Sequence, residues 1–97
     1  SVDWSAAAVY KMASALTGNI EFDFTNYVAG QVLTIYNISG AYTVTLDSDA
    51  STSESFLKAG GDYDGSTTNI LQIECLAGGD DAVFVYSVST YTSDPTP

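Results

Sequence analysis

The sequence predicts an all-β protein, a single antiparallel β-sandwich (jelly-roll-like or Ig-like) of about six to eight short strands. Three observations predict this class. Apolar and polar residues alternate with a period of two, the period at which side chains change face along a strand. Turns that contain glycine separate the alternating runs. Nothing in the 97 residues shows the strand–helix alternation of a parallel sheet.

The clearest alternation is in the run Ile20-Glu21-Phe22-Asp23-Phe24, whose apolar side chains share one face while its acids share the other. A shift of one residue would bury both acids, at a cost of several kcal/mol for each unpaired charge. A small domain has a net stability of only about 5–15 kcal/mol. We therefore expect Ile20, Phe22 and Phe24 to face the core, and Glu21 and Asp23 to face water.

Two further strands follow, over 32–38 and 41–46, and the dipeptide Ser39-Gly40 between them is typical of a tight hairpin turn. With the 20–25 strand they predict a three-stranded antiparallel meander, the smallest sheet that is stable by itself. The side chains expected to face the core are Leu33, Ile35, Tyr42, Val44 and Leu46. Those expected on the opposite face of the 32–38 strand are Val32, Tyr36 and Ile38.

The N-terminal region has two interpretations. As a helix, it would place Trp4, Ala8, Met12 and Leu16 on one face. As a strand, it would be joined by the turn Thr17-Gly18-Asn19 to the strand at Ile20. We expect the strand, over 9–16, in a hairpin with its neighbour. Residues 1–8 are then expected to form an N-terminal arm, and residues 9–91 the sandwich domain.

The second half of the chain predicts a long loop and one hairpin. Residues 47–69 are rich in Ser, Thr, Asp and Gly and predict a loop without regular structure, held to the sandwich by Phe56 and Leu57. Strands over 70–76 and 82–88, separated by a Gly-rich loop, predict a hairpin. Residues 92–97 are expected to be an extended C-terminal tail.

Composition excludes several classes of function. The net charge of −10, from two lysines and twelve acids, argues against nucleic acid and anionic membranes as partners. No apolar run is long enough to span a bilayer, and no secretory signal is visible. The chain contains no histidine, which excludes Ser-His-Asp catalysis and the usual zinc sites. We expect no enzyme, no cofactor, and a core role for the single cysteine, Cys75.

Calcium is the most reasonable ion for this sequence. Residues 62–65 (DYDG) have the D-x-D-G start of an oxygen-rich loop, but the third ligand and closing glutamate of an EF-hand are missing. We therefore expect solvated turn acids and no metal site. The other loop acids considered are Asp47, Asp49, Asp80 and Asp81.

The twelve aromatic residues exceed the needs of one small core. Three interpretations remain open for part of this set: a protein interface, a carbohydrate-stacking platform, or partial burial at sheet edges. The residues concerned are Tyr27, Tyr36, Tyr63, Tyr86 and Tyr91.

From Leu16 to Tyr91 the chain resembles a recurring β-domain of structural proteins of tailed bacteriophages. The matching features are Leu16-Thr17-Gly18-Asn19, Phe24-Thr25-Asn26, Ala29-Gly30-Gln31, Tyr42-Thr43-Val44-Thr45 and Val83-Phe84-Val85-Tyr86. It departs from the tail-fibre form in having Leu46 and Tyr86-Ser87-Val88-Ser89 where that form carries a tryptophan and an aromatic-Asp-Gly-x-x-Trp ending.

The resemblance implies a stand-alone capsid decoration (cement) protein that stabilises the head. It would be made in the bacterial cytoplasm and would bind the major capsid protein on the outer surface of the virion, as a trimer. The residues expected at the capsid or subunit interface are Ser1, Val2, Asp3, Trp4 and Tyr91. The alternative is a tail-fibre or head-fibre module that binds cell-surface carbohydrate.

Overall fold

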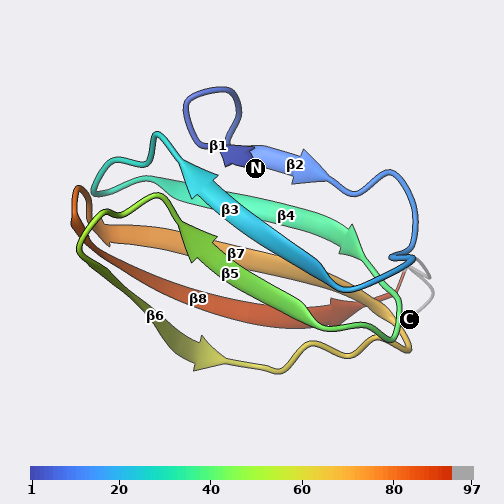
Figure 1. The fold of residues 1–97 in the computed structure, drawn as a ribbon. Coiled ribbons are helices and arrows are strands. Elements are labelled where there is room, and N and C mark those ends of the chain that lie inside the picture. Colours follow the sequence, from blue (N-terminus) through green and yellow to red (C-terminus); the bar gives the residue numbers. More distant parts are fainter. Residues whose placement is uncertain (93–97) are drawn as a thin grey trace.

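The computed structural model describes residues 1–92, and within them the chain is all-β, with eight strands in two sheets (Figure 1). This part of the chain holds no helix that could cross a membrane. The strands are β1 (Val2–Asp3), β2 (Val9–Lys11), β3 (Ile20–Thr25), β4 (Val32–Ile38), β5 (Val44–Ser48), β6 (Ser53–Gly60), β7 (Thr68–Ala77) and β8 (Asp81–Tyr91).

The chain winds as a coil. A three-stranded sheet has the order β1-β3-β5, and a five-stranded sheet has the order β2-β4-β7-β8-β6. Each odd strand from β1 to β5 is followed by an even strand in the opposite sheet, so that β1–β2, β3–β4 and β5–β6 form three successive turns. Strands β7 and β8 then occupy the place between β4 and β6 in the larger sheet only (Figure 1).

The expected antiparallel pairing is therefore wrong for most of the fold. Among residues 1–92, β1–β3, β2–β4, β3–β5 and β6–β8 pair in parallel, while β4–β7 and β7–β8 are antiparallel. The 18–46 meander does not form, because β4 lies in the sheet opposite β3 and β5. The connection at Gly40, whose φ is +116°, is an arch between sheets, not a hairpin. The predicted β7–β8 hairpin is confirmed.

The predicted faces of β3 are confirmed. Phe22 and Phe24 are buried, Ile20 packs against the core, and Glu21 lies exposed on the outer face. Alternation fixes which side chains face inward whatever strand lies alongside, so this inference did not depend on the pairing. The other predicted inward residues are also in or against the core, except Tyr42, which precedes β5 and is 44% exposed.

Strand β4 contains an irregularity that the sequence analysis missed. Asn37 has a φ of +63°, and the register with β7 shifts between Ile35 and Ile38. The extra residue turns Ile38 inward, where it is 2% exposed. The prediction that Ile38 faces away from the core is therefore wrong. Asn37 tolerates this conformation better than most residues, and its side-chain amide donates to the carbonyl oxygen of Met12 at 2.8 Å.

Residues 1–8 are part of the domain in this structure, not a free arm. β1 pairs with β3, and Trp4 is 4% exposed, with its ring 5.7 Å from the rings of both Phe24 and Phe84. Of the strand expected over 9–16, only Val9–Lys11 forms, and it pairs in parallel with β4 in place of the predicted hairpin with β3. Burial of Trp4 explains the first difference, because it holds the N-terminal segment against the core.

The region 47–69 is not a structureless loop, since it contains β6. Within the described residues this strand pairs with β8 alone. Only two of its side chains, those of Glu54 and Phe56, are partly buried, so few apolar residues mark the strand in the sequence. After β6, the buried amide of Asn69 fixes the return of the chain. It donates to the carbonyl oxygens of Ile38 (3.0 Å) and Asp64 (2.7 Å) and accepts from the N–H of Asp64 (3.0 Å). Of the expected tail, 92–97, all but Thr92 lies outside the described residues.

Candidate functional site

The two sheets differ in width, and this leaves one flank of the larger sheet uncovered. Three strands cannot cover five, so β6 and much of β8 lie outside the area covered by the small sheet (Figure 1). A half-open groove of about 400 Å³ runs along this flank, between β5 on one side and β6 and β8 on the other. We call it the flank groove. It is lined by Ile38, Val44, Thr45, Leu46, Phe56, Lys58, Gly61, Asp62, Tyr63, Leu71, Tyr86 and Val88.

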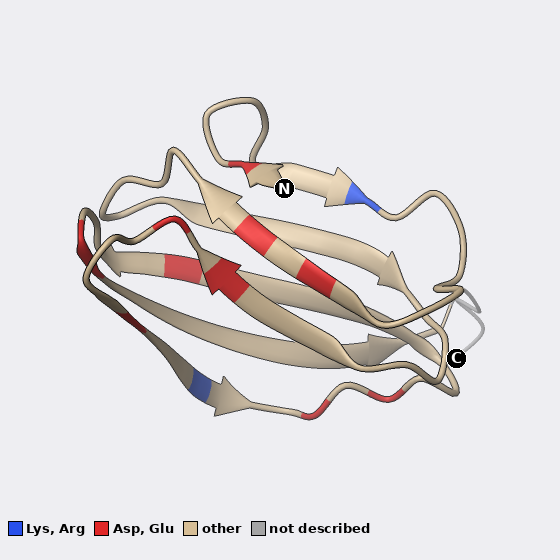
Figure 2. Ribbon diagram, viewed as in Figure 1, with Lys and Arg blue, Asp and Glu red and all other residues tan. Residues whose placement is uncertain are grey.

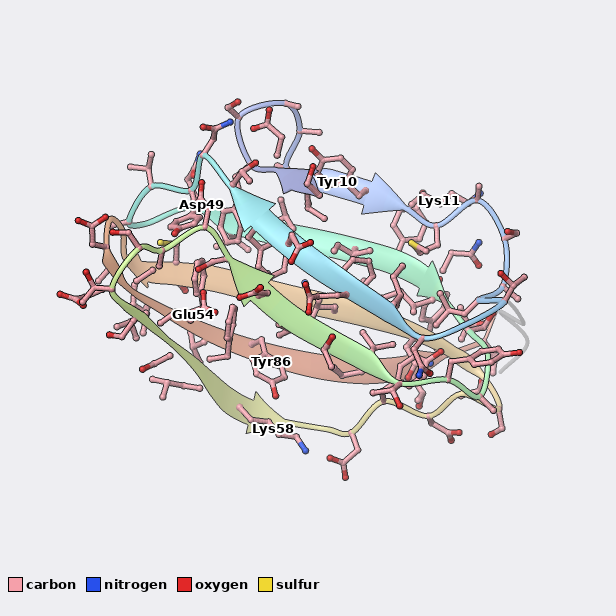
Figure 3. All side chains as sticks on the ribbon, in the orientation of Figure 1. Tyr10, Lys11, Asp49, Glu54, Lys58 and Tyr86 are labelled. Carbon is pink, nitrogen blue, oxygen red and sulfur yellow. The ribbon has the colours of Figure 1, made fainter. Side chains whose placement is uncertain are left out.

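The floor of the flank groove is apolar. Phe56 and Val88 pack against the core from β6 and β8, and Tyr86 lies in the opening between β5 and β6 (Figure 3). The ring of Phe56 stacks on that of Phe84 at 4.9 Å with an interplanar angle of 9°. Gly61 closes one part of the floor: its φ is +67°, and a Cβ there would lie 1.7 Å from the carbonyl oxygen of Val88. The groove is thus built on a tightly packed base.

Three polar side chains at the groove, those of Lys58, Asp62 and Tyr63, already have partners within the chain. The ammonium of Lys58 pairs with the carboxylate of Asp62, and both side chains are well exposed. The hydroxyl of Tyr63 donates to the carbonyl oxygen of Gly40 at 2.7 Å. Burial raises the pKa of Tyr63, with the nearby charge of Asp64 adding to the shift. The floor therefore offers a matching surface to apolar side chains of a ligand, and these three side chains are already engaged.

One wall of the groove is a free strand edge. Within residues 1–92, β5 pairs only with β3. The carbonyl oxygen of Thr43 accepts from the N–H of Ile20 at 2.9 Å, and the N–H of Asp49 donates to the carbonyl oxygen of Phe24 at 3.2 Å. Odd-numbered residues thus bond toward β3. By the alternation of a ladder, the backbone groups of Val44 and Leu46 point away from β3, along the flank.

Carboxylates gather on the outer face of the small sheet, beside this edge (Figure 2). Oxygens of Glu21, Asp23 and Asp47 lie within 4.8 Å of one another. A hydrogen bond with Asp23, followed by the charge of that residue, raises the pKa of Glu21. Burial and the neighbouring Asp47 raise the pKa of Glu54, while the hydrogen bond from Glu54 lowers the pKa of Asp47. These oxygens could hold a divalent cation, but their arrangement also suits a positively charged side chain.

All but one of the acids considered for calcium lie outside this group. Asp64 accepts hydrogen bonds from the backbone N–H and hydroxyl of Ser66, which lower its pKa, and Asp62 pairs with Lys58. Asp49 follows β5, Asp80 precedes β8 and Asp81 begins it. Of the acids named in the sequence analysis for calcium, the three-carboxylate group includes only Asp47, and its other members come from β3. Parallel pairing of β3 with β5 brings them together, which the sequence analysis did not foresee.

The five tyrosines do not form one platform. Tyr63 and Tyr86 line the flank groove. Tyr27 packs against the rings of Phe84 (4.9 Å) and Trp4 (6.3 Å), and burial raises its pKa. Tyr36 is half-buried in β4, and the hydroxyl of Tyr91 accepts from the backbone N–H of Asn37 at 3.1 Å. Partial burial is thus the common state of the set.

The expected interface residues are dispersed. Val2 and Trp4 are in the core, whereas Ser1 is exposed and Tyr91 lies at the end of β8. Asp3 accepts hydrogen bonds from Ser5 and Asn26, which lower its pKa. Contact of these five residues with a capsid stays a prediction, and Val2 and Trp4 would have to leave the core to make it.

Cys75 is buried in β7, and burial raises the pKa of its thiol, as expected for a packed core residue.

Comparison of the chain with protein-family models, with curated proteins and with solved structures finds no match. Any function must therefore be argued from the flank groove and its surroundings.

Proposed function

We propose that this protein decorates the head of a tailed bacteriophage, binding the outer surface of the major capsid protein lattice and stabilising it. The observation that carries the proposal is the flank groove, an apolar strip beside a free strand edge. Such a surface suits attachment to another protein better than catalysis. The resemblance of residues 16–91 to phage structural β-domains supplies the choice of partner.

The acidic surface supports an exposed position on a particle. With a net charge of −10, copies of the chain repel one another and other anionic surfaces. A trimer on a symmetric lattice would repeat modest contacts many times, and the resulting effective concentration raises avidity without a large single interface. In this proposal the protein is not an enzyme, and its partners are the capsid protein and further copies of itself.

The test is co-sedimentation with empty capsids of the phage whose genome encodes the chain. The protein is expected to pellet with capsids and to stay in solution without them, and its bound mass is expected to saturate at a fixed number of copies per capsid protein. Mass measurement of the free protein checks the trimer. Failure to pellet at any ratio of protein to capsid would overturn the proposal.

Glycan binding is the second candidate, favoured by the two tyrosines, Tyr63 and Tyr86, that line the flank groove. A glycan-array signal that is lost in Tyr63→Ala and kept in Tyr63→Phe would support stacking of a sugar on the ring. The internal pairing of Lys58 with Asp62 argues against this candidate, because sugars are held by directional hydrogen bonds as well as by stacking.

A further inference from the structure

We propose that the free edge of β5 accepts an extended segment of a partner protein as a fourth strand of the small sheet, and that this segment alternates apolar with basic residues. The inference rests on the proposed function for the source of the segment, the capsid protein, and it names the contact that function requires. Three features of the flank lead to it: the backbone edge, the groove beneath it and the acids beside it.

The backbone edge is suited to strand addition. The N–H and C=O groups of Val44 and Leu46 face the flank, while the N–H of Ser48 is already bonded to the carboxylate of Asp47 at 2.9 Å. β5 contains neither proline nor lysine, two residues that commonly protect edges. The edge of β6, in contrast, carries Lys58. An incoming strand would form a second ladder, on the edge of β5 that faces away from β3.

The flank groove would receive every second side chain of that strand. Strands pair about 4.8 Å apart and sheets pack about 10 Å apart. A strand beside β5 therefore lies over the inner faces of β8 and β6, where Phe56, Tyr86 and Val88 line the groove. Its inward side chains would replace water on this surface, so they are expected to be apolar. This is strand addition with pockets for alternate side chains.

The acids select the other side chains. Asp23 is the cross-strand neighbour of Asp47, and Glu21 that of Thr45, all on the outer face of the small sheet. Outward side chains of the added strand would stand next to Thr45 and Asp47. Lysine or arginine there would relieve the crowding of the carboxylates, whereas acids would add to it.

The same charges disfavour a second copy of this chain as the occupant. Pairing of β5 with β5 would place two Asp47 carboxylates on one face, between molecules that each carry −10. Like charges that face each other across strands are destabilising. A basic partner segment therefore fits the edge better than self-association.

The experiment titrates the ¹⁵N-labelled protein with three synthetic peptides of seven residues. The first alternates lysine with valine or isoleucine, the second carries glutamate in place of lysine, and the third has the composition of the first without the alternation. The first is expected to shift the amide signals of Val44–Ser48 and to protect the amides of Val44 and Leu46 from hydrogen exchange. It is also expected to bind about tenfold more tightly than the other two.

Two variants test the geometry. Leu46→Pro removes an N–H that faces the flank and leaves the bonds to β3, and Leu46→Ala is its matched control for loss of the side chain. Binding of the first peptide is expected to be about tenfold weaker in Leu46→Pro than in Leu46→Ala. If the proline variant does not fold, Asp47→Lys keeps the test, with at least about threefold weaker binding of the basic peptide expected.

Three results would overturn the inference: no shift with the first peptide at its solubility limit, equal binding of the basic and acidic peptides, or protection of the β5 amides in a dimer of the free protein. Co-sedimentation with capsids separates this inference from the proposed function. Pelleting of Leu46→Pro as well as wild type would keep decoration and refute strand addition. Peptide binding without pelleting of wild type would keep strand addition and refute decoration.

Discussion

Replacing Trp4 by alanine tests whether the N-terminal segment belongs to the core. Trp4 is only 4% exposed and packs on Phe24, Tyr27 and Phe84. Burial of about 150–250 Å² at about 25 cal/mol per Å² gives roughly 4–6 kcal/mol as an upper bound. The indole N–H of Trp4 is buried without a hydrogen-bond partner in residues 1–92. This unpaired donor costs roughly 1–3 kcal/mol, which reduces the net stabilisation that the side chain provides. The difference is about 1–5 kcal/mol, and we expect a loss of about 3 kcal/mol, at the lower end of the range for such substitutions.

The assay is thermal and urea unfolding followed by far-ultraviolet circular dichroism, because the variant lacks the only tryptophan. The expected loss lowers Tm by roughly 12–24 °C for a domain of this size. Ser1→Ala, at an exposed position, is the control and is expected to leave Tm unchanged. Trp4→Phe, which keeps an aromatic ring and removes the unpaired N–H, should lose much less than Trp4→Ala.

A loss below about 0.5 kcal/mol in Trp4→Ala, the size of an ordinary surface substitution, would refute the core role. So would wild-type tryptophan fluorescence that iodide quenches as readily as that of a free peptide. Either result would return residues 1–8 to a free arm, available to reach a partner. Removal of residues 1–8 is expected to unfold or strongly destabilise the domain, so that loss of capsid binding in such a truncation would not locate the interface.

Three further changes test the rest of the structure. Asn69→Ala leaves buried backbone groups unpaired and should cost about 2–4 kcal/mol in urea unfolding, against little change in Gln72→Ala, an exposed position of the same strand. Gly61→Ala should cost at least about 1–3 kcal/mol, whereas Gly60→Ala, with open space around it, should be neutral in the same assay. The raised pKa of Glu21 means that the folded state binds protons more tightly, so its charge destabilises the fold above that pKa and the penalty disappears as pH falls. Glu21→Gln should therefore raise Tm at pH 7 and not at about pH 3; an equal gain at both would contradict the carboxylate repulsion.

Apart from those of Ile38 and Tyr42, the faces of the strands could be predicted from the sequence, whereas of the strand pairings only that of β7 with β8 could. The alternation around Phe22 and Phe24 places those side chains inside whatever strand lies alongside, and the same holds for Leu71 and Ile73 in β7. Whether a chain turns back on itself or crosses to the other sheet depends on the connection. Ser39-Gly40 is compatible with both, and the bonds that fix the arch come from distant residues such as Gly65.

The candidate site was out of reach of sequence reasoning for the same reason. Tyr63 and Tyr86 were among the tyrosines considered, but nothing local marks them as neighbours across the flank groove. Phe56 was expected to hold a loop to the sandwich, since β6 carries only one strongly apolar side chain that faces inward. The grouping of Glu21 with Asp47 follows from the parallel pairing of β3 with β5, whereas the predicted meander placed the 32–38 strand between those two strands.

The flank is open because the alternation of strands between the two sheets stops after β6. Three turns would give two sheets of equal width, but β7 and β8 enter the larger sheet between β4 and β6 and have no counterpart in the smaller one. The uncovered strip is therefore two strands wide, and its apolar residues, Phe56, Tyr86 and Val88, are only partly buried. One more strand beside β5 would cover much of this strip and satisfy an edge at the same time. A single added strand would meet both needs, which is why the proposed partner segment is placed at this flank.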